Sequence, residues 1–204
     1  GSMVTQALNR AMDVLKRQDL EAAKQLIAND RDINAKRFKV EENCLILIAT
    51  QQPMARDMRL LASILEISGE LERMGDYAKG IAKITLYIGK QPPAKPLVHM
   101  PVMCEKVIIM LREALDAFVN QDVNAARTIP ERDDEVDQLY NTINRELIDI
   151  IIANPSKIDQ ANYLSWAAHN LERAADRVTN ICERIIYTIT GEFTADDLLG
   201  EIFG

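Results

Sequence analysis

Apolar residues recur along this chain at intervals of three and four, which is the spacing of one face of an α-helix. Two stretches show the pattern most clearly, and the second lies one hundred residues after the first. Their apolar positions are Ile64, Ile67, Leu71, Met74, Ala78 and Ile81, then Ala167, Leu171, Ala174, Val178, Ile181 and Ile185. Both stretches read Leu-Glu-Arg-x-x-Asp, from 71 and from 171. A match at one fixed offset indicates an internal repeat, so each stretch is predicted to be one long amphipathic helix.

The same periodicity predicts two more helical segments before each of these helices. In the first half they cover 4–16 and a stretch that Asp19 caps and that runs to about 50, with an irregularity near 29–30. The third helix of that half starts near Pro53 and ends near 88. In the second half a helix over 102–119 precedes one that Asp122 opens and that Pro130 breaks or kinks. The sixth helix follows the turn Asn154-Pro155-Ser156.

Shorter matches at an offset of 103 extend the repeat to the earlier helices, for example Gln18-Asp19 and Gln121-Asp122. Short connections favour antiparallel neighbours, so each half is predicted to be a three-helix bundle. The expected fold is all-α, with two tandem three-helix bundles at 3–90 and 102–190. A proline-rich linker at 91–101 joins them, and 191–204 forms a C-terminal tail.

Composition and charge narrow the function. The formal net charge of −7, with no tract rich in Lys and Arg, argues against nucleic-acid binding. The three cysteines are scattered, without Cys-x-x-Cys, and are expected to be buried, inert thiols in a reducing cytoplasmic setting. Trp166 falls at helical spacing and is predicted to lie in the core. No apolar run is long enough to span a bilayer, so direct membrane insertion is not expected.

Acidic residues gather at one level of each predicted bundle when the helices are folded about their turns. Asp133 and Asp137 then lie beside Glu172 and Asp176 in the second half. Asp30 and Asn34 lie beside Glu72 and Asp76 in the first half. Carboxylates gathered without His or Cys suit hard cations such as Mg²⁺, Ca²⁺, Mn²⁺ or ferric iron. Because Asn34 replaces one charge, the first half is expected to bind metal less tightly.

A solvated charged face explains the same acidic pairs, because like charges four residues apart destabilise a helix by only about 0.2–0.5 kcal/mol. The Glu-x-x-His pattern of di-iron bundles is absent, since neither His99 nor His169 has Glu three residues before it. From the residues alone, a metal site and a solvated face therefore stay open as alternatives.

Two copies of Leu-Glu-Arg-x-x-Asp, the stretch Gln-Gln-Pro-Met-Ala-Arg-Asp-Met-Arg at 51–59 and Asp-x-x-Ile-Asn at 30–34 resemble the PhoU family of phosphate-transport regulators. The resemblance covers nearly the whole chain and implies a non-enzymatic pair of three-helix bundles with multinuclear metal clusters at (Glu/Asp)-x-x-x-Asp motifs. The metal-site residues that it implies are Glu72, Asp76, Asp133, Asp137, Glu172 and Asp176, with Asp30 and Asn34 as weaker candidates. The metal would be iron, Mn, Mg or Zn.

The resemblance also implies a negative regulator of phosphate-starvation genes. Its partners would be the ATPase subunit of the phosphate ABC transporter and a membrane sensor histidine kinase, which the protein would reach from the cytoplasm. Two alternatives to this metal-binding regulator remain at this stage, namely a carboxylate–metal helical-bundle enzyme and a metal-free acidic adaptor. The sequence leaves the oligomeric state open, with a homodimer as one alternative.

Overall fold

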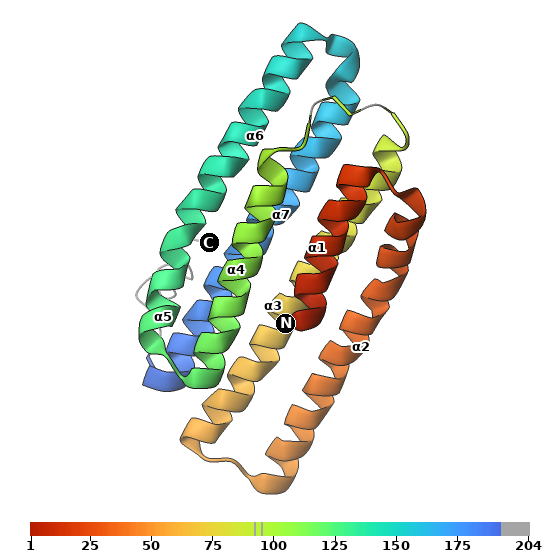
Figure 1. Cartoon of the computed structure of the whole chain (residues 1–204). Helices are drawn as coiled ribbons and strands as arrows, with labels where there is room; N and C mark the ends of the chain where they lie inside the picture. The colour runs from red at the N-terminus through yellow and green to blue at the C-terminus, as the bar shows by residue number, and fades with distance from the viewer. Residues whose placement is uncertain (92, 95, 193–204) are drawn as a thin grey trace, which may run out of the picture.

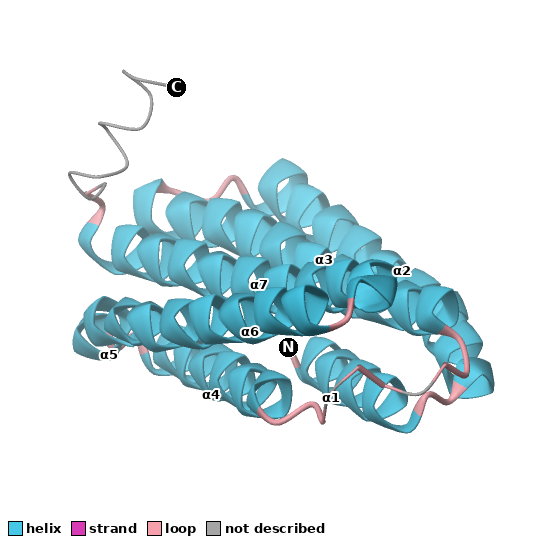
Figure 2. Ribbon diagram, turned by 90° about the horizontal axis from the view of Figure 1, so that it is seen from above, coloured by secondary structure: helices cyan, strands magenta, loops and turns pink. Residues whose placement is uncertain are grey.

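The computed structural model describes residues 1–91, 93–94 and 96–192, and every regular element among them is a helix (Figures 1 and 2). The α-helices are α1 (Ser2–Arg17), α2 (Leu20–Gln51), α3 (Ala55–Ile88), α4 (His99–Asn120), α5 (Val123–Thr128), α6 (Asp133–Ala153) and α7 (Ile158–Thr190). Two short 3₁₀ helices, η1 (Ile129–Arg132) and η2 (Pro155–Lys157), join α5 to α6 and α6 to α7. The predicted tail at 191–204 lies outside the described residues beyond 192.

The internal repeat is visible in the backbone as well as in the sequence. Asp19 Oδ1 accepts a hydrogen bond from Ala22 N at 3.0 Å, and Asp122 Oδ1 accepts one from Ala125 N at the same distance. Such caps satisfy amides that a helix start leaves without partners. The residue before each cap, Gln18 or Gln121, has a φ of 54°, in the left-handed region that ends a helix. The prediction of an all-α fold with two three-helix bundles is confirmed.

The second segment of each bundle differs between the halves. Helix α2 is continuous from Leu20 to Gln51, so the irregularity expected near 29–30 is wrong. In the second half, Pro130 lies in η1 and separates α5 from α6, as predicted. The position equivalent to Pro130 is Ile27, which keeps its backbone N–H and packs against the core. A proline lacks that donor and therefore interrupts the helix in the second half alone.

Helix α4 begins at His99, three residues before the predicted start. Pro101 therefore lies in the first turn of α4. The amides of a first turn have no intrahelical partner, so a proline there removes no helical hydrogen bond. Pro101 therefore belongs to the start of α4 and not to the end of the linker.

Helices α3 and α7 run antiparallel and join the two bundles through their packed faces (Figure 1). Tyr87 stacks near Tyr163 at one end, with ring centroids 5.6 Å apart, and Glu66 pairs with Arg184 nearer the other end. Their buried side chains form one continuous core with those of both bundles. Because α3 and α7 pack along their lengths, each Glu-x-x-x-Asp motif lies on one of the two central helices of the molecule.

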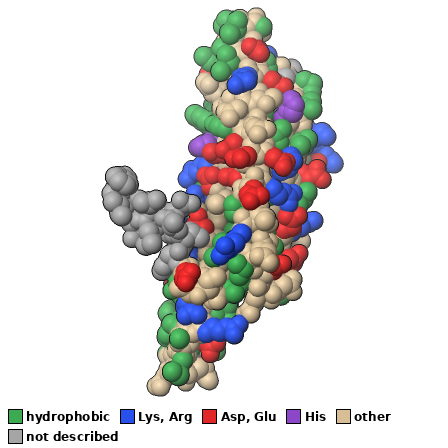
Figure 3. Space-filling model, turned by 90° about the vertical axis from the view of Figure 1, so that its left-hand side faces the viewer, with side chains coloured by type: hydrophobic (Ala, Val, Ile, Leu, Met, Phe, Trp, Pro, Cys, Tyr) green, Lys and Arg blue, Asp and Glu red, His purple; other side chains and the backbone are tan. Residues whose placement is uncertain are grey.

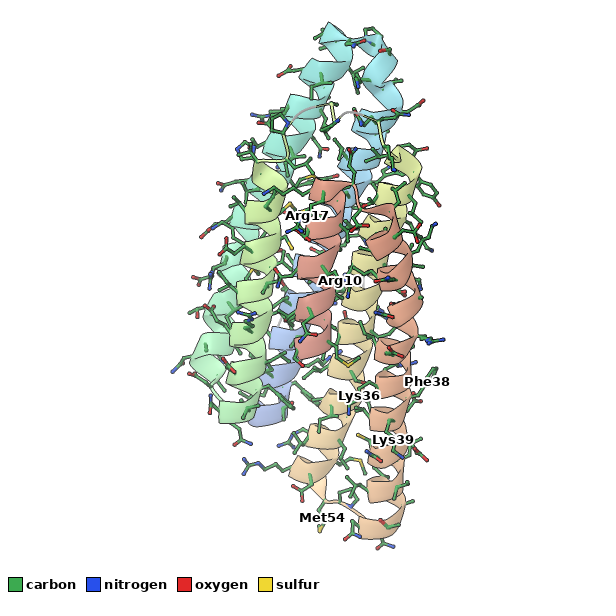
Figure 4. All side chains as sticks on the ribbon, turned by 45° about the vertical axis from the view of Figure 1, so that its right-hand side comes forward. Arg10, Arg17, Lys36, Phe38, Lys39 and Met54 are labelled. Carbon is green, nitrogen blue, oxygen red and sulfur yellow. The ribbon has the colours of Figure 1, made fainter. Side chains whose placement is uncertain are left out.

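Apolar side chains remain exposed at the two ends of the molecule and beside Tyr163 on α7. Met54, at the turn between α2 and α3, is 80% exposed (Figure 4), and Ile152 near the end of α6 is 75% exposed. Trp166 is 57% exposed, so its predicted place in the core is wrong. It lies beside the buried positions Leu164 and Ala167 but faces outward, and it contacts Tyr163 edge-on, with centroids 5.7 Å apart.

All three cysteines are buried and free, as predicted. Burial raises the pKa of the Cys104 and Cys182 thiols to about 12. Among the described residues, every helix is too short or too polar to traverse a lipid bilayer.

Candidate functional site

The second acidic cluster consists of Asp133, Asp137, Glu172 and Asp176. Asp133 is the first residue of α6 and Asp137 follows one turn later, while Glu172 and Asp176 lie one turn apart on the adjacent helix α7. Residues four apart share a helix face, so both pairs converge on one region. Acidic side chains gather near the middle of the face that α6 presents (Figure 3).

The pKa of Asp133 is affected by burial and by the other three carboxylates of the cluster. Burial raises the pKa of Asp133 to about 6, with further raising contributions from Asp137, Asp176 and Glu172. Burial also raises the pKa of Asp137, and that of Glu172 against the opposing effect of His169. A negative charge that is partly removed from water and faces other carboxylates favours protonation. The cluster therefore carries excess negative charge at neutral pH, because among the described residues its four carboxylates face only Arg177, 3.9 Å from Asp176 Oδ2, and His169 beside Glu172.

Two oxygens of the second cluster lack a hydrogen-bond partner among the described residues. They are Asp133 Oδ1 and Glu172 Oε2, both inaccessible to solvent. His169 Nδ1 lies 3.1 Å from Glu172 Oε2 and acts to lower the pKa of Glu172 against the effect of burial, so Asp133 Oδ1 is the less compensated of the two oxygens. A buried carboxylate oxygen without a donor costs free energy unless a cation or proton satisfies it. These two oxygens are the clearest sign that the cluster suits a positively charged ligand.

The first acidic cluster consists of Asp30 and Asn34 on α2 and Glu72 and Asp76 on α3. Asn34 Nδ2 donates to Asp30 Oδ2 at 3.1 Å. Lys79 contributes a cation to this group, because its Nζ lies 2.7 Å from Asp30 Oδ2 and 3.1 Å from Asp76 Oδ1. The hydrogen bond to Asp30 is the largest effect that raises the pKa of Lys79. The charge of this cluster is therefore partly compensated from within the protein.

Charges of both signs act on Glu72 of the first cluster. Burial raises its pKa first, the carboxylate of Asp76 raises it further, and the Arg37 guanidinium opposes both. Arg37 also pairs with Glu41 at 3.5 Å, so its charge is shared along α2. The first cluster thus has two cationic neighbours, Arg37 near Glu72 and Lys79 between Asp30 and Asp76.

The structure brings the eight predicted residues together as two groups of four, one in each bundle. Sequence reasoning missed Lys79 and His169, although both lie three residues from an acidic residue of the cluster, Asp76 or Glu172, on the same helix face. No three His, Cys, Asp or Glu side chains of the described part of the chain are close enough together to form a ready-made metal site.

The two clusters differ in the number of oxygen ligands that they leave available to a metal ion. The second cluster offers oxygen ligands, two of them without partners, and its pairs come from adjacent helices. Such a donor set fits a hard cation that prefers carboxylates. The first cluster offers three carboxylates and one amide, and an ammonium group already contacts two of those carboxylates. The second cluster has the donor types that a hard cation needs, but its side chains would have to draw closer together to bind one. The first cluster would in addition require Lys79 to move.

Fold and site together define a class of tandem helical-repeat protein, in which two three-helix bundles share a central pair of helices and each carries an acidic cluster. The PhoU domain family matches residues 1–85 and 100–185 of the chain. These two matched segments correspond to the two structural repeats.

The relatives and solved structures agree with this match. The phosphate-specific transport system accessory protein PhoU homolog of Aquifex aeolicus is 36% identical over 190 residues, which cover 93% of this chain and 86% of that protein. PhoU of Escherichia coli K12 is 35% identical over 192 residues, covering 94% and 80%. The crystal structure of PhoU from Pseudomonas aeruginosa superposes with a TM-score of 0.87 at 32% identity, covering 94% of this chain and 92% of that one. The chain belongs to the PhoU family, whose members are non-enzymatic accessory and regulatory proteins of phosphate transport.

Proposed function

We propose that this protein regulates phosphate uptake and phosphate-starvation signalling as a metal-loaded adaptor. The names of its relatives connect them with the phosphate-specific transport system. The partners that we propose are the ATPase subunit of the phosphate ABC transporter and a membrane sensor histidine kinase. Binding to such partners would bring the protein to the membrane, since the described chain has no helix that could span it.

The proposed metal ligands are the carboxylates of the second cluster, Asp133, Asp137, Glu172 and Asp176. The observation that supports this proposal is the pair of oxygens, Asp133 Oδ1 and Glu172 Oε2, that are buried without a hydrogen-bond partner. A bound iron, Mn²⁺, Mg²⁺ or Zn²⁺ ion would add positive charge to these four carboxylates beyond that of Arg177 and His169. The residues themselves hold the site in place from two packed helices, so its shape depends on the contact between α6 and α7.

Metal titration of two matched double variants tests the proposal. Protein freed of metal by a chelator is dialysed against Mn²⁺, and the bound metal is measured by elemental analysis. Glu172→Ala/Asp176→Ala should lose most of the bound metal, whereas Glu72→Ala/Asp76→Ala should keep it. Removal of two exposed carboxylates outside both clusters, in Glu21→Ala/Glu42→Ala, controls for the change in net charge.

Equal loss of metal from the two cluster variants would contradict the assignment to the second cluster. Wild-type protein that binds no Mn²⁺ at all, and carries no metal when purified without chelator, would instead support a metal-free acidic adaptor. The two results are distinguishable because the first requires bound metal and the second excludes it.

A further inference from the structure

Lys79 occupies a defined position within the first acidic cluster. Its Nζ bridges Asp30 of α2 and Asp76 of α3, at 2.7 and 3.1 Å. The Asp30 side chain is only 6% exposed and the Lys79 side chain 26%, so the pair lies below the surface. Asn34 donates to the same oxygen of Asp30 that Lys79 contacts. One oxygen of this buried carboxylate, Oδ2, is therefore engaged by two groups of the protein.

The equivalent position in the second repeat is Thr179, one hundred residues later. Thr179 Oγ1 is buried and lacks a hydrogen-bond partner among the described residues. Its repeat neighbours are Asp133 in place of Asp30 and Asp176 in place of Asp76. The two clusters thus match in their bridging carboxylates and differ in the residue one turn after the Glu-x-x-x-Asp pair.

We propose that the Lys79 ammonium is the resident cation of the first cluster and that it excludes metal from it. Lys79 and Thr179 would then decide which of the two repeats takes a metal ion. This inference rests on the proposed function, because it assumes that the second cluster binds metal.

The physical reason is competition for the same oxygens. An ammonium group is a compact, strongly hydrated charge with three donors, and two of them are directed at Asp30 and Asp76 here. A metal ion that binds these carboxylates must first break both ion pairs and return Lys79 to solvent. Moving Lys79 away without a replacement would leave Asp30 as a buried, unpaired charge. At position 179 a threonine has no charge, so this position supplies no competitor for a metal at the second cluster; Arg177 is near Asp176 there, but at the longer distance of 3.9 Å.

Exchanging the two residues tests the inference with Mn²⁺ as the probe. In the Glu172→Ala/Asp176→Ala background only the first cluster is intact, and there Lys79→Thr should raise the bound Mn²⁺ at sub-saturating metal. The expected rise is about 2–30-fold, because each of the two ammonium–carboxylate contacts is worth about 1.4–5-fold in an equilibrium constant. Thr179→Lys in the otherwise unchanged protein should lower Mn²⁺ binding at the second cluster by a similar factor.

Lys83→Thr is the matched control, because Lys83 is an exposed lysine one turn further along α3 and the substitution changes the net charge equally. It should leave Mn²⁺ binding unchanged. Circular dichroism confirms that each variant is folded, and if Lys79→Thr does not fold, the Thr179→Lys variant decides. A folded Lys79→Thr variant with no gain in Mn²⁺, or a Thr179→Lys variant with no loss, would overturn the inference.

The same measurements separate this inference from the proposed function. Wild-type protein without Mn²⁺ at the second cluster would refute metal binding there, whereas a gain in the Lys79→Thr variant would still support the role of Lys79. Conversely, wild-type protein that binds Mn²⁺ at the second cluster, together with a Lys79→Thr variant that gains none, would refute the role of Lys79 alone.

Discussion

Asp133→Asn removes one negative charge from the second acidic cluster and should stabilise the metal-free protein at neutral pH. The pKa of Asp133 rises from 3.8 to about 6 on folding, through burial first and then through Asp137, Asp176 and Glu172. A difference of about two pKa units corresponds to about 3 kcal/mol. Because Asp133 is partly exposed, solvent screening reduces the expected gain to about 1–2 kcal/mol.

The sign of the pH dependence follows from the same pKa. The folded state binds the Asp133 proton more tightly than the unfolded state, so the contribution to stability is greatest below about pH 4 and is lost as the pH rises through 6. Asparagine has no such proton. The difference in stability between variant and wild type should therefore appear between pH 4 and 6 and remain constant above pH 7.

Asp30→Asn is the matched substitution in the first cluster and should have the opposite sign. Asp30 accepts hydrogen bonds from Lys79 and Asn34, so its negative charge is compensated and its loss leaves the ammonium with a weaker partner. The expected loss is about 1–3 kcal/mol, below the value for a fully buried pair because Lys79 is partly exposed. Urea unfolding with a chelator present measures both variants. Shifts of the same sign in the two variants would refute this account of the clusters.

Two further predictions concern the buried thiols and the membrane. Cys104 and Cys182 should react with a thiol reagent at pH 8 at least about 1,000-fold more slowly in the folded than in the unfolded protein, because a pKa of about 12 leaves little thiolate; equal rates would contradict their burial. The protein should not sediment with protein-free anionic vesicles in the absence of metal, since its net charge of −7 is repelled, but should be retained by the phosphate transporter complex in a pull-down. Robust sedimentation with bare vesicles would show that membrane recruitment does not require a protein partner.

The helices could be predicted from the sequence because each has an apolar face of regular period. The set that includes Leu171, Val178 and Ile185 is buried as expected. Caps at Asp19 and Asp122 and the break at Pro130 were also predictable, since each depends on local backbone chemistry. The pairing of α3 with α7 could not be predicted. An amphipathic pattern shows which face of a helix is buried, but it does not name the helix that covers it.

Helix α3 illustrates this limit. Ile67, Met74 and Ile81 are buried as the apolar pattern predicts, but Tyr77 and Ile84 are buried as well. A helix that packs on its own bundle and on α7 is covered on more than one face, so a single apolar stripe underestimates its burial. Trp166 shows the reverse error, because helical spacing placed it in the core while the structure leaves it beside Tyr163 on the surface.

The acidic clusters show why a repeated motif does not guarantee a repeated site. Counting ligands in the sequence distinguishes the repeats only by Asn34 in place of Asp137. The structure adds a larger difference, because Lys79 has a long side chain that reaches across from α3 to Asp30 on α2, forty-nine residues earlier. Such reach depends on the distance between two helices, which the motif does not contain. Since one ammonium cancels one carboxylate, the residue after the motif changes the charge of the cluster as much as the loss of a ligand would. The tandem repeat therefore supplies two equivalent frameworks, and single side chains such as Lys79 and Thr179 determine how differently each one binds a cation.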